Sequence, residues 1–233
     1  MIKEELIQRS PVRIFEKSIH GGLRAGEIGI IASPAGIGKT SVLVQLALDK
    51  LLQNEKVIHV SFTQHTDYVL SWYEDIFNEF IKKKSLDHAV DVKNEVVKNR
   101  VLLNFNQDGV TGDQILKSLR ALIIEGGFKA GSIIIDGFDF ARTDRGRMEA
   151  VKAAAEEMGL SFWYSCNVNG NNFDKKNIPL ALKDYLDLLD VVIVLEPKAD
   201  HVALTASKDR NTAELEHLAV KLDPKTLLIS LER

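Results

Sequence analysis

The sequence contains only one cysteine, Cys166, among its 233 residues. One cysteine cannot form an internal disulfide or build a zinc cluster, so both are excluded as stabilising elements. Long apolar runs are also missing, and the run VVIVL (191–195) is far below the roughly 20 residues that span a bilayer. The N-terminal stretch MIKEELIQRSPVR has no apolar core typical of a secretory signal. We therefore expect a cytoplasmic protein without a membrane partner.

A strong excess of either charge is absent as well, since the formal net charge is -3. This balance lowers the expectation of a dedicated nucleic-acid binder, although a local basic patch remains compatible with it. Hydrophobic residues make up 45% of the chain and charged residues 27%, which is typical of a folded protein. The length fits one full α/β domain, and we expect residues 1–233 to form a single domain.

Short apolar runs alternate with amphipathic stretches along the chain. The runs predict strands at residues 27–33, 56–62, 100–105, 131–140, 160–166, 190–196, 201–209 and 227–230. The amphipathic stretches predict helices at residues 39–53, 66–83, 111–127 and 146–159. The more polar stretch 85–99 predicts a second, looser helix or an excursion. Strands that alternate with helices favour a mostly parallel sheet covered by helices. The strands that close the chain predict an antiparallel extension of this sheet.

The segment ASPAGIGKTS (32–41) fits the phosphate-binding pattern G-x-x-x-x-G-K-[ST], except that Ser33 replaces the first glycine. It lies between a predicted strand and a predicted helix, as the motif requires. Serine is small, so we expect the loop to tolerate it. The predicted nucleotide-binding residues are Ser33, Pro34, Ala35, Gly36, Ile37, Gly38, Lys39, Thr40 and Ser41.

Each part of this segment has a chemical reason. Gly36 and Gly38 let backbone N–H groups approach phosphate oxygens closely, and the helix that follows presents its N-terminus to the anion. Lys39 supplies a positive charge to the outer phosphates. Thr40 offers a hydroxyl group to a magnesium ion.

The stretch IHGGLRAGEIGIIAS (19–33), which leads into this loop, resembles the RecA-like ATPases, in particular the KaiC, RadA and DnaB helicase branch. The resemblance covers about residues 9–230, with its specific motifs in a few places. It implies a RecA-like P-loop NTPase core that binds ATP and Mg²⁺. DnaB-type proteins also accept a small residue other than glycine at the position of Ser33.

Two further motifs follow from this resemblance. The strand GSIIIDGFDF (131–140) is similar to the second nucleotide motif, in which Asp136 would hold the magnesium. Asn167 falls where the family senses the γ-phosphate, although a shift of one residue would place Cys166 there instead.

The segment TASKDRNTAE resembles the lysine-x-arginine strand end of this family. Lys208 and Arg210 would then reach a neighbouring subunit's γ-phosphate. The resemblance thus implies a homo-oligomer, with a hexameric ring as one form.

The sequence departs from the family after its second strand, where a glutamate activates the attacking water. Thr63 or Gln64 occupies that place, and neither can accept a proton as a carboxylate does. Gln64 could still orient a water molecule. The carboxylates of Asp67, Glu74 and Asp139 and the imidazole of His65 are the other candidates for the role of base. Loss of a general base typically costs about 10²- to 10⁴-fold in rate, so we expect weak or absent ATP hydrolysis.

Two functions from different classes fit these motifs. The first is a nucleotide-dependent regulatory or scaffold ATPase, and the alternative is a DNA-dependent ATPase of the recombinase or helicase type. The loops that would contact DNA carry basic and aromatic residues, namely Arg142, Arg145, Arg147, Phe173, Lys175 and Lys176. Because the net charge is slightly negative, nucleic acid is the less favoured partner. A degenerate subunit that no longer binds nucleotide is disfavoured by the intact GKT.

Overall fold

A computed structural model of the chain describes residue 7 and residues 10–62, 65–84, 90–106, 112–170, 172–212 and 215–232. Within these residues a single sheet of nine strands runs in the order β3-β2-β4-β5-β1-β6-β7-β8-β9. The strands are β1 (Ile28–Ser33), β2 (Lys56–Ser61), β3 (Arg100–Asn104), β4 (Ala130–Asp136), β5 (Ser161–Asn167), β6 (Val191–Pro197), β7 (Val202–Asp209), β8 (Glu216–Leu222) and β9 (Ile229–Leu231). The neighbours from β3 to β6 are parallel, and those from β6 to β9 are antiparallel. The mixed α/β architecture expected from the sequence is therefore confirmed.

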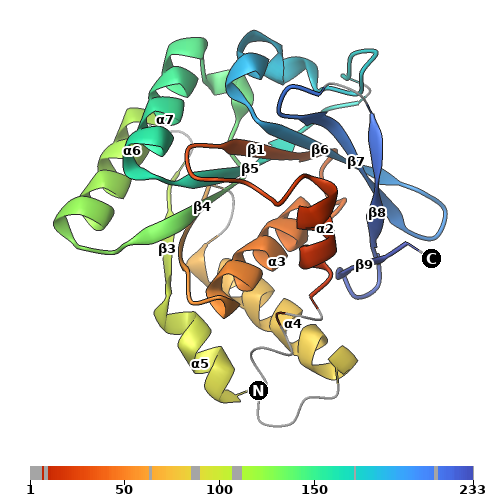
Figure 1. Ribbon diagram of the computed structural model, residues 1–233, viewed down its shortest axis with the longest axis horizontal. Helices are drawn as coiled ribbons and strands as arrows, with labels where there is room; N and C mark the ends of the chain where they lie inside the picture. The colour runs from red at the N-terminus through yellow and green to blue at the C-terminus, as the bar shows by residue number, and fades with distance from the viewer. Residues whose placement is uncertain are drawn as a thin grey trace.

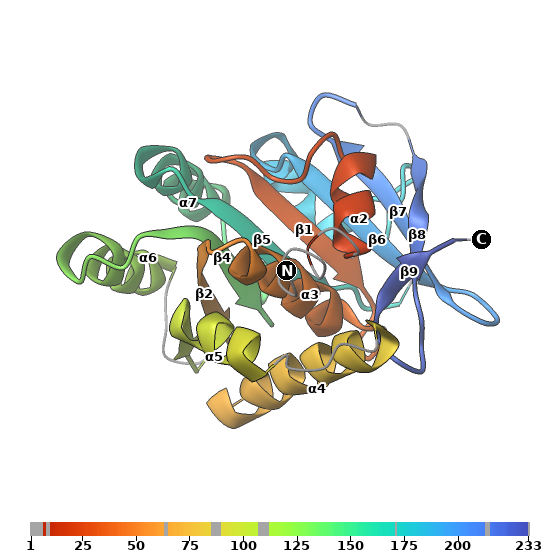
Figure 2. The same ribbon diagram turned by 60° about the horizontal axis from the view of Figure 1, so that its bottom comes forward.

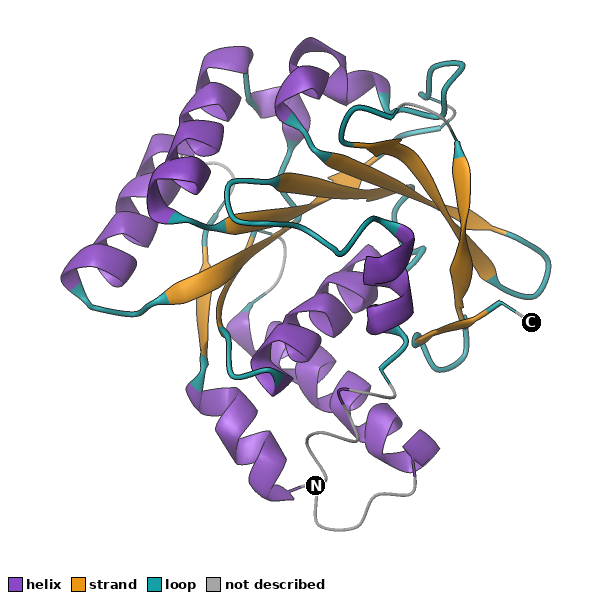
Figure 3. Cartoon of the chain, in the orientation of Figure 1, coloured by secondary structure: helices purple, strands orange, loops and turns teal. Residues whose placement is uncertain are grey.

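Helices cover both faces of the sheet (Figures 1 and 3). One face packs against α2 (Val12–Ser18), α3 (Lys39–Leu52), α4 (Thr66–Lys84) and α5 (Val90–Lys98). The other face packs against α6 (Gly112–Arg120), α7 (Arg145–Met158) and the 3₁₀ segments η2 (Phe140–Arg142) and η3 (Leu180–Leu188). Helix α6 continues into the π-helical turn η1 (Ala121–Glu125). Two apolar cores result, one on each face of the sheet.

Local sequence signals explain where several elements begin and end. Helix α7 starts after Asp144, whose carboxylate accepts a hydrogen bond from the Arg147 amide at 2.9 Å. It ends at Gly159, which adopts the left-handed conformation with φ +66°. Strand β4 ends at Asp136, earlier than the predicted residue 140, because Gly137 turns the chain with φ +79°.

Three of the observed elements, namely β8, α2 and η3, were not predicted from the sequence. None of them has the long apolar run or the clear helical period on which the predictions were based. Strand β8 has no long apolar run, but its buried residues Leu218, Val220 and Leu222 alternate with more exposed ones. Helix α2 has only seven residues, and η3 is a 3₁₀ segment interrupted by a kink at Tyr185, so neither gives a clear α-helical period. Residues 85–89 of the predicted helix 85–99 lie outside the described residues, and α5 begins at Val90.

The parallel strands bring their carboxyl ends together along one edge of the sheet. Ser33 at the end of β1 pairs in register with Asn167 at the end of β5. Asp136 at the end of β4 pairs with Ser61 at the end of β2. Loops at the carboxyl ends of parallel strands commonly form ligand sites in such sheets. The predicted nucleotide-binding motifs thus meet at this edge.

Candidate functional site

The predicted phosphate-binding loop joins β1 to α3. Every residue of β1 is buried, which fixes the position from which the loop leaves the sheet. Gly36 and Gly38 have φ angles of +79° and +116°, a region that favours glycine. A Cβ atom on Gly38 would lie 2.4 Å from Cδ2 of the buried Leu222. Glycine at position 38 is therefore required both by the backbone and by the packing.

The N-terminus of α3 lies in the wall of a pocket. Gly38 occupies the N-cap position and has no side chain that could cap the first amides of the helix. Gly38, Lys39 and Thr40 all line the pocket. Free N–H groups and the positive end of the helix dipole make such a terminus favourable for an anion.

Lys39 is held against its own loop and is only 7% exposed. Its Nζ atom donates hydrogen bonds to the carbonyl oxygens of Ser33 and Pro34, at 3.0 and 2.8 Å, and to Ser33 Oγ at 3.2 Å. Burial lowers the pKa of Lys39, and the nearby Asp136 carboxylate partly offsets this shift. The serine that replaces the usual glycine therefore supplies an extra acceptor for the lysine.

Thr40 and Asp136 form the second polar pair of the site. Thr40 Oγ1 donates a hydrogen bond to Asp136 Oδ2 at 2.7 Å, although the two residues are 96 positions apart. Asp136 is 4% exposed at the end of β4. A hydroxyl and a carboxylate are hard oxygen ligands of the kind that Mg²⁺ prefers. Among the described residues, no group of three or more histidine, cysteine or acidic side chains could hold a metal ion.

These groups share one pocket of about 340 Å³. Its described lining consists of Ala35, Gly36, Gly38, Lys39, Thr40, Trp72, Asp136, Gly137, Ser165, Asn167 and Leu227. Seven of the fourteen predicted site residues are thus brought together in the described lining. Pro34 contributes its carbonyl oxygen to Lys39, whereas Ile37 packs against the apolar core.

Ser41 joins the start of α3 to a distant turn, and its predicted contact with a nucleotide stays a prediction. Its hydroxyl donates to the carbonyl of Leu227, to which Gln45 Nε2 also donates at 2.9 Å. Gln45 Oε1 in turn accepts a hydrogen bond from the Ile229 amide at 2.7 Å. Helix α3 is thereby tied to the turn between β8 and β9, which places the Leu227 side chain in the pocket wall.

The structure describes only some of the residues that were expected to act on water or on the γ-phosphate. Thr63 and Gln64 lie outside the described residues. Asn167 lines the pocket, whereas its alternative Cys166 is 1% exposed, and burial raises the pKa of the Cys166 thiol to about 12. Among the described lining residues, Asp136 is the only carboxylate.

Of the other candidate bases, Glu74 pairs with Lys93 at 3.1 Å on α5, outside the pocket lining. His65 and Asp67 are exposed, and neither is among the described lining residues. Asp139 accepts a hydrogen bond from the Ala141 amide and lines a neighbouring pocket of about 600 Å³, which shares Gly137 and Asn167 with the first.

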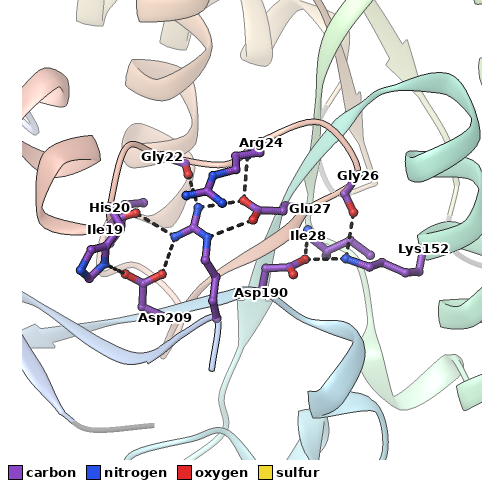
Figure 4. Close-up of polar contacts among 11 residues, drawn as sticks. Ile19, His20, Gly22, Arg24, Gly26, Glu27, Ile28, Lys152, Asp190 and Asp209 are labelled. Atoms are coloured by element: carbon purple, nitrogen blue, oxygen red, sulfur yellow. Dashed lines mark hydrogen bonds and ion pairs between the residues drawn. The ribbon is translucent and has the colours of Figure 1, made fainter. Parts of the chain in front are cut away.

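Lys208 and Arg210 lie at the opposite end of the sheet from the phosphate-binding loop. Lys208 pairs in register with Val192 near the start of β6, and its Nζ atom donates to the Leu189 carbonyl. Arg210 contacts Glu27, just before β1 (Figure 4). The six residues of β1 separate this end from the loop by about 20 Å. The contact of Lys208 and Arg210 with a neighbouring subunit stays a prediction.

The arginines of the loop after β4 are all paired within the chain. Arg142 lies 3.3 Å from Asp139, and Arg147 lies 3.6 Å from Asp144. Arg145 contacts Asp187 at 2.7 Å. In the second loop, Lys175 and Lys176 are exposed. A nucleic-acid phosphate would have to compete with carboxylates for each arginine.

Comparisons with known proteins identify no family for the chain. No protein-family model matches the chain, and a search of curated proteins also gives no match. In the described part of the chain, no helix combines the length and apolar character needed to cross a bilayer.

Proposed function

We propose that the chain binds ATP together with Mg²⁺ in the pocket at the carboxyl ends of β1, β4 and β5. We further propose that it is a RecA-like nucleotide-dependent regulatory or scaffold protein with weak or absent hydrolysis. The hydrogen bond between Thr40 and Asp136 is the main support, because it places two magnesium-type oxygen ligands beside the glycine turn and Lys39.

In this proposal the loop amides and Lys39 hold the phosphates. Lys39 would exchange its hydrogen bonds with the Ser33 and Pro34 carbonyls for bonds with phosphate oxygens. Thr40 and Asp136 would hold the metal, which when bound neutralises charge on the phosphates. Trp72 and Leu227 give the pocket two large apolar side chains against which the rest of the nucleotide can pack.

Slow hydrolysis is supported by the absence of a second carboxylate among the described lining residues. Asp136 is engaged with Thr40 and would be further occupied by the metal. Gln64 remains the candidate for orienting water and Asn167 for contacting the γ-phosphate. The alternative of a DNA-dependent ATPase draws less support, because the three arginines near the site are paired with carboxylates.

A homo-oligomer, with a hexameric ring as one form, is part of the proposal through the RecA-like resemblance. The predicted role of Arg210 at a neighbour's phosphate would require it to leave Glu27 and Asp209 on assembly. Light scattering with and without ATP tests this point, because a chain that stays monomeric in both conditions contradicts the assembly.

The central experiment is calorimetric titration with ATP, first with Mg²⁺ and then with a chelator. Lys39→Ala should weaken binding about 10- to 100-fold, as expected for the loss of charge-assisted bonds to phosphate. Asp136→Asn should mainly reduce the difference in ATP affinity between the titration with Mg²⁺ and the titration with a chelator. Lys117→Ala, an exposed lysine on α6, is the matched control and should bind as the parent does.

Two outcomes count against the proposal. If Lys39→Ala binds ATP as tightly as the parent, the loop is not a phosphate site. If single-turnover hydrolysis by the parent is fast, the regulatory role is wrong, and DNA stimulation becomes the next measurement.

A further inference from the structure

A second, smaller pocket lies between α4 and α5, away from the phosphate-binding loop. Its volume is about 180 Å³, and its described lining comes from both helices, from α3 and from the start of β3. Figure 2 shows α3, α4 and α5 together on one side of the sheet. Leu48, Tyr73, Phe77 and Val96 form apolar walls and are each at most 3% exposed. An apolar cavity of about 150 Å³ is large enough to hold benzene. The pocket therefore has room for a chain of about six carbon atoms.

The guanidinium of Arg100 lies beside these apolar walls. The guanidinium carbon of Arg100 lies 4.0 Å from the centre of the Tyr73 ring. Tyr73 is itself fixed by a hydrogen bond of 3.0 Å between its hydroxyl and Nδ1 of the buried His59. Arg100 therefore rests on a rigid aromatic surface at the pocket.

Arg100 has no acidic partner in the described part of the chain. No described carboxylate forms an ion pair with it. Glu74, the acidic residue of the described pocket lining, pairs with Lys93 at 3.1 Å. Burial lowers the pKa of Arg100, which reflects the partial loss of water around the guanidinium. A partly desolvated guanidinium without a described carboxylate partner is well suited to a planar, negatively charged group.

We propose that this pocket binds a small apolar carboxylate, with the carboxylate on Arg100 and the hydrocarbon part between α4 and α5. The guanidinium fork matches the two carboxylate oxygens, and the buried walls accept the chain. Lys93 and Glu74 also line the pocket but pair with each other at 3.1 Å, so Arg100 sets the preference for an anionic ligand. This site is independent of the nucleotide proposal, since no described residue lines both pockets.

Hexanoate is the probe, and its binding is followed by amide chemical shifts in ¹⁵N-labelled protein. We expect shifts at residues of α4 and α5 and a Kd on the order of 1 mM. Hexanamide, which has the same length without the charge, should bind at least tenfold more weakly, and hexylamine should not bind. Equal affinities for hexanoate and hexanamide would overturn the proposal, as would the absence of hexanoate binding.

Substitutions at Arg100 and Val97 test whether these residues contact the bound carboxylate. Arg100→Gln should weaken hexanoate binding at least tenfold, whereas Lys82→Gln, which removes an exposed cation of α4, should leave it unchanged. Val97 is 48% exposed at the rim, so Val97→Asp should keep the fold and also weaken binding by repulsion. Val97→Asp provides the decisive result if Arg100→Gln fails to fold. Unchanged affinity in a folded Arg100→Gln or in Val97→Asp would refute the site.

Discussion

Arg210 and Glu27 form a two-point ion pair, with Nε to Oε1 at 2.9 Å and Nη2 to Oε2 at 2.8 Å. The remaining N–H groups of Arg210 donate to the carbonyls of Ile19 and Gly22 and to the carboxylate of Asp209 (Figure 4). All five donors of the guanidinium are therefore used. The bonds join the segment before β1 to the end of β7, and this segment thus has a structural role.

Arg210→Ala should lower the free energy of unfolding by about 2 to 4 kcal/mol, because it leaves partly buried carboxylates and carbonyls without partners. Arg210→Lys should recover only part of this loss, since an ammonium cannot form the two-point contact. Urea unfolding measures the free energy of unfolding of both variants, and Arg24→Ala at an exposed site is the control. If Arg210→Ala keeps the parent's stability and loses only ATP-dependent assembly, Arg210 serves a neighbouring subunit instead.

Alanine substitutions at the two glycines of the predicted phosphate-binding loop should lower the stability of the fold by different amounts. At Gly36 a Cβ meets nothing within 4 Å, so Gly36→Ala should cost only the backbone strain of about 1 to 2 kcal/mol. Gly38→Ala carries a similar strain and also a contact of 2.4 Å with Leu222, so it should cost clearly more. Thermal unfolding compares the two variants, and equal losses would show that Leu222 moves aside without cost.

The tie between α3 and the β8–β9 turn should depend on Gln45. Gln45→Leu leaves the Ile229 amide without its acceptor and removes one of two donors to the Leu227 carbonyl. We expect a loss of about 1 to 3 kcal/mol and faster hydrogen exchange at Ile229. Gln53→Leu, just past the C-terminal end of the same helix, is the control. Unchanged exchange at Ile229 in Gln45→Leu would contradict the tie.

The sequence is informative where its patterns are local. Buried parallel strands such as β1 are continuous apolar runs, and the glycine loop before α3 has a fixed pattern, so both were predicted closely. Strand β8 was missed because it lies near the border of the sheet, and only its alternating residues face the core. An apolar run is therefore a poor guide to antiparallel strands near an edge.

The candidate site could be predicted only in its local parts. Lys39 and Thr40 follow from the motif, and Asp136 was proposed from the resemblance of residues 131–140 to a second nucleotide motif. The contributions of Leu227 and Trp72 depend on how distant elements pack, which no local pattern records. The same holds for Arg210, because nothing next to it in the sequence indicates that Glu27 lies beside it. Gln64 lies outside the described residues, so its role stays a prediction.

His59 should make the stability of the fold depend on pH. It is fully buried on β2, and its Nε2 atom has no hydrogen-bond partner among the described residues. Burial is the main cause that lowers the pKa of His59 to about 4. In the unfolded chain the pKa is about 6.5, so between about pH 6.5 and 4 the unfolded state binds more protons. Stability from this residue is thus present above about pH 6.5 and falls as the pH decreases toward 4.

The expected loss between about pH 8 and pH 5 is about 2 kcal/mol from His59 alone. Urea unfolding over this range measures the total change, and His59→Phe isolates the histidine because it cannot titrate. The free energy of unfolding of His59→Phe should decrease less than that of the parent as the pH is lowered. His201 lies near the surface, so His201→Phe should follow the parent more closely. If the parent and His59→Phe lose stability in parallel, His59 accepts a proton in the folded chain without cost, and burial does not control its charge.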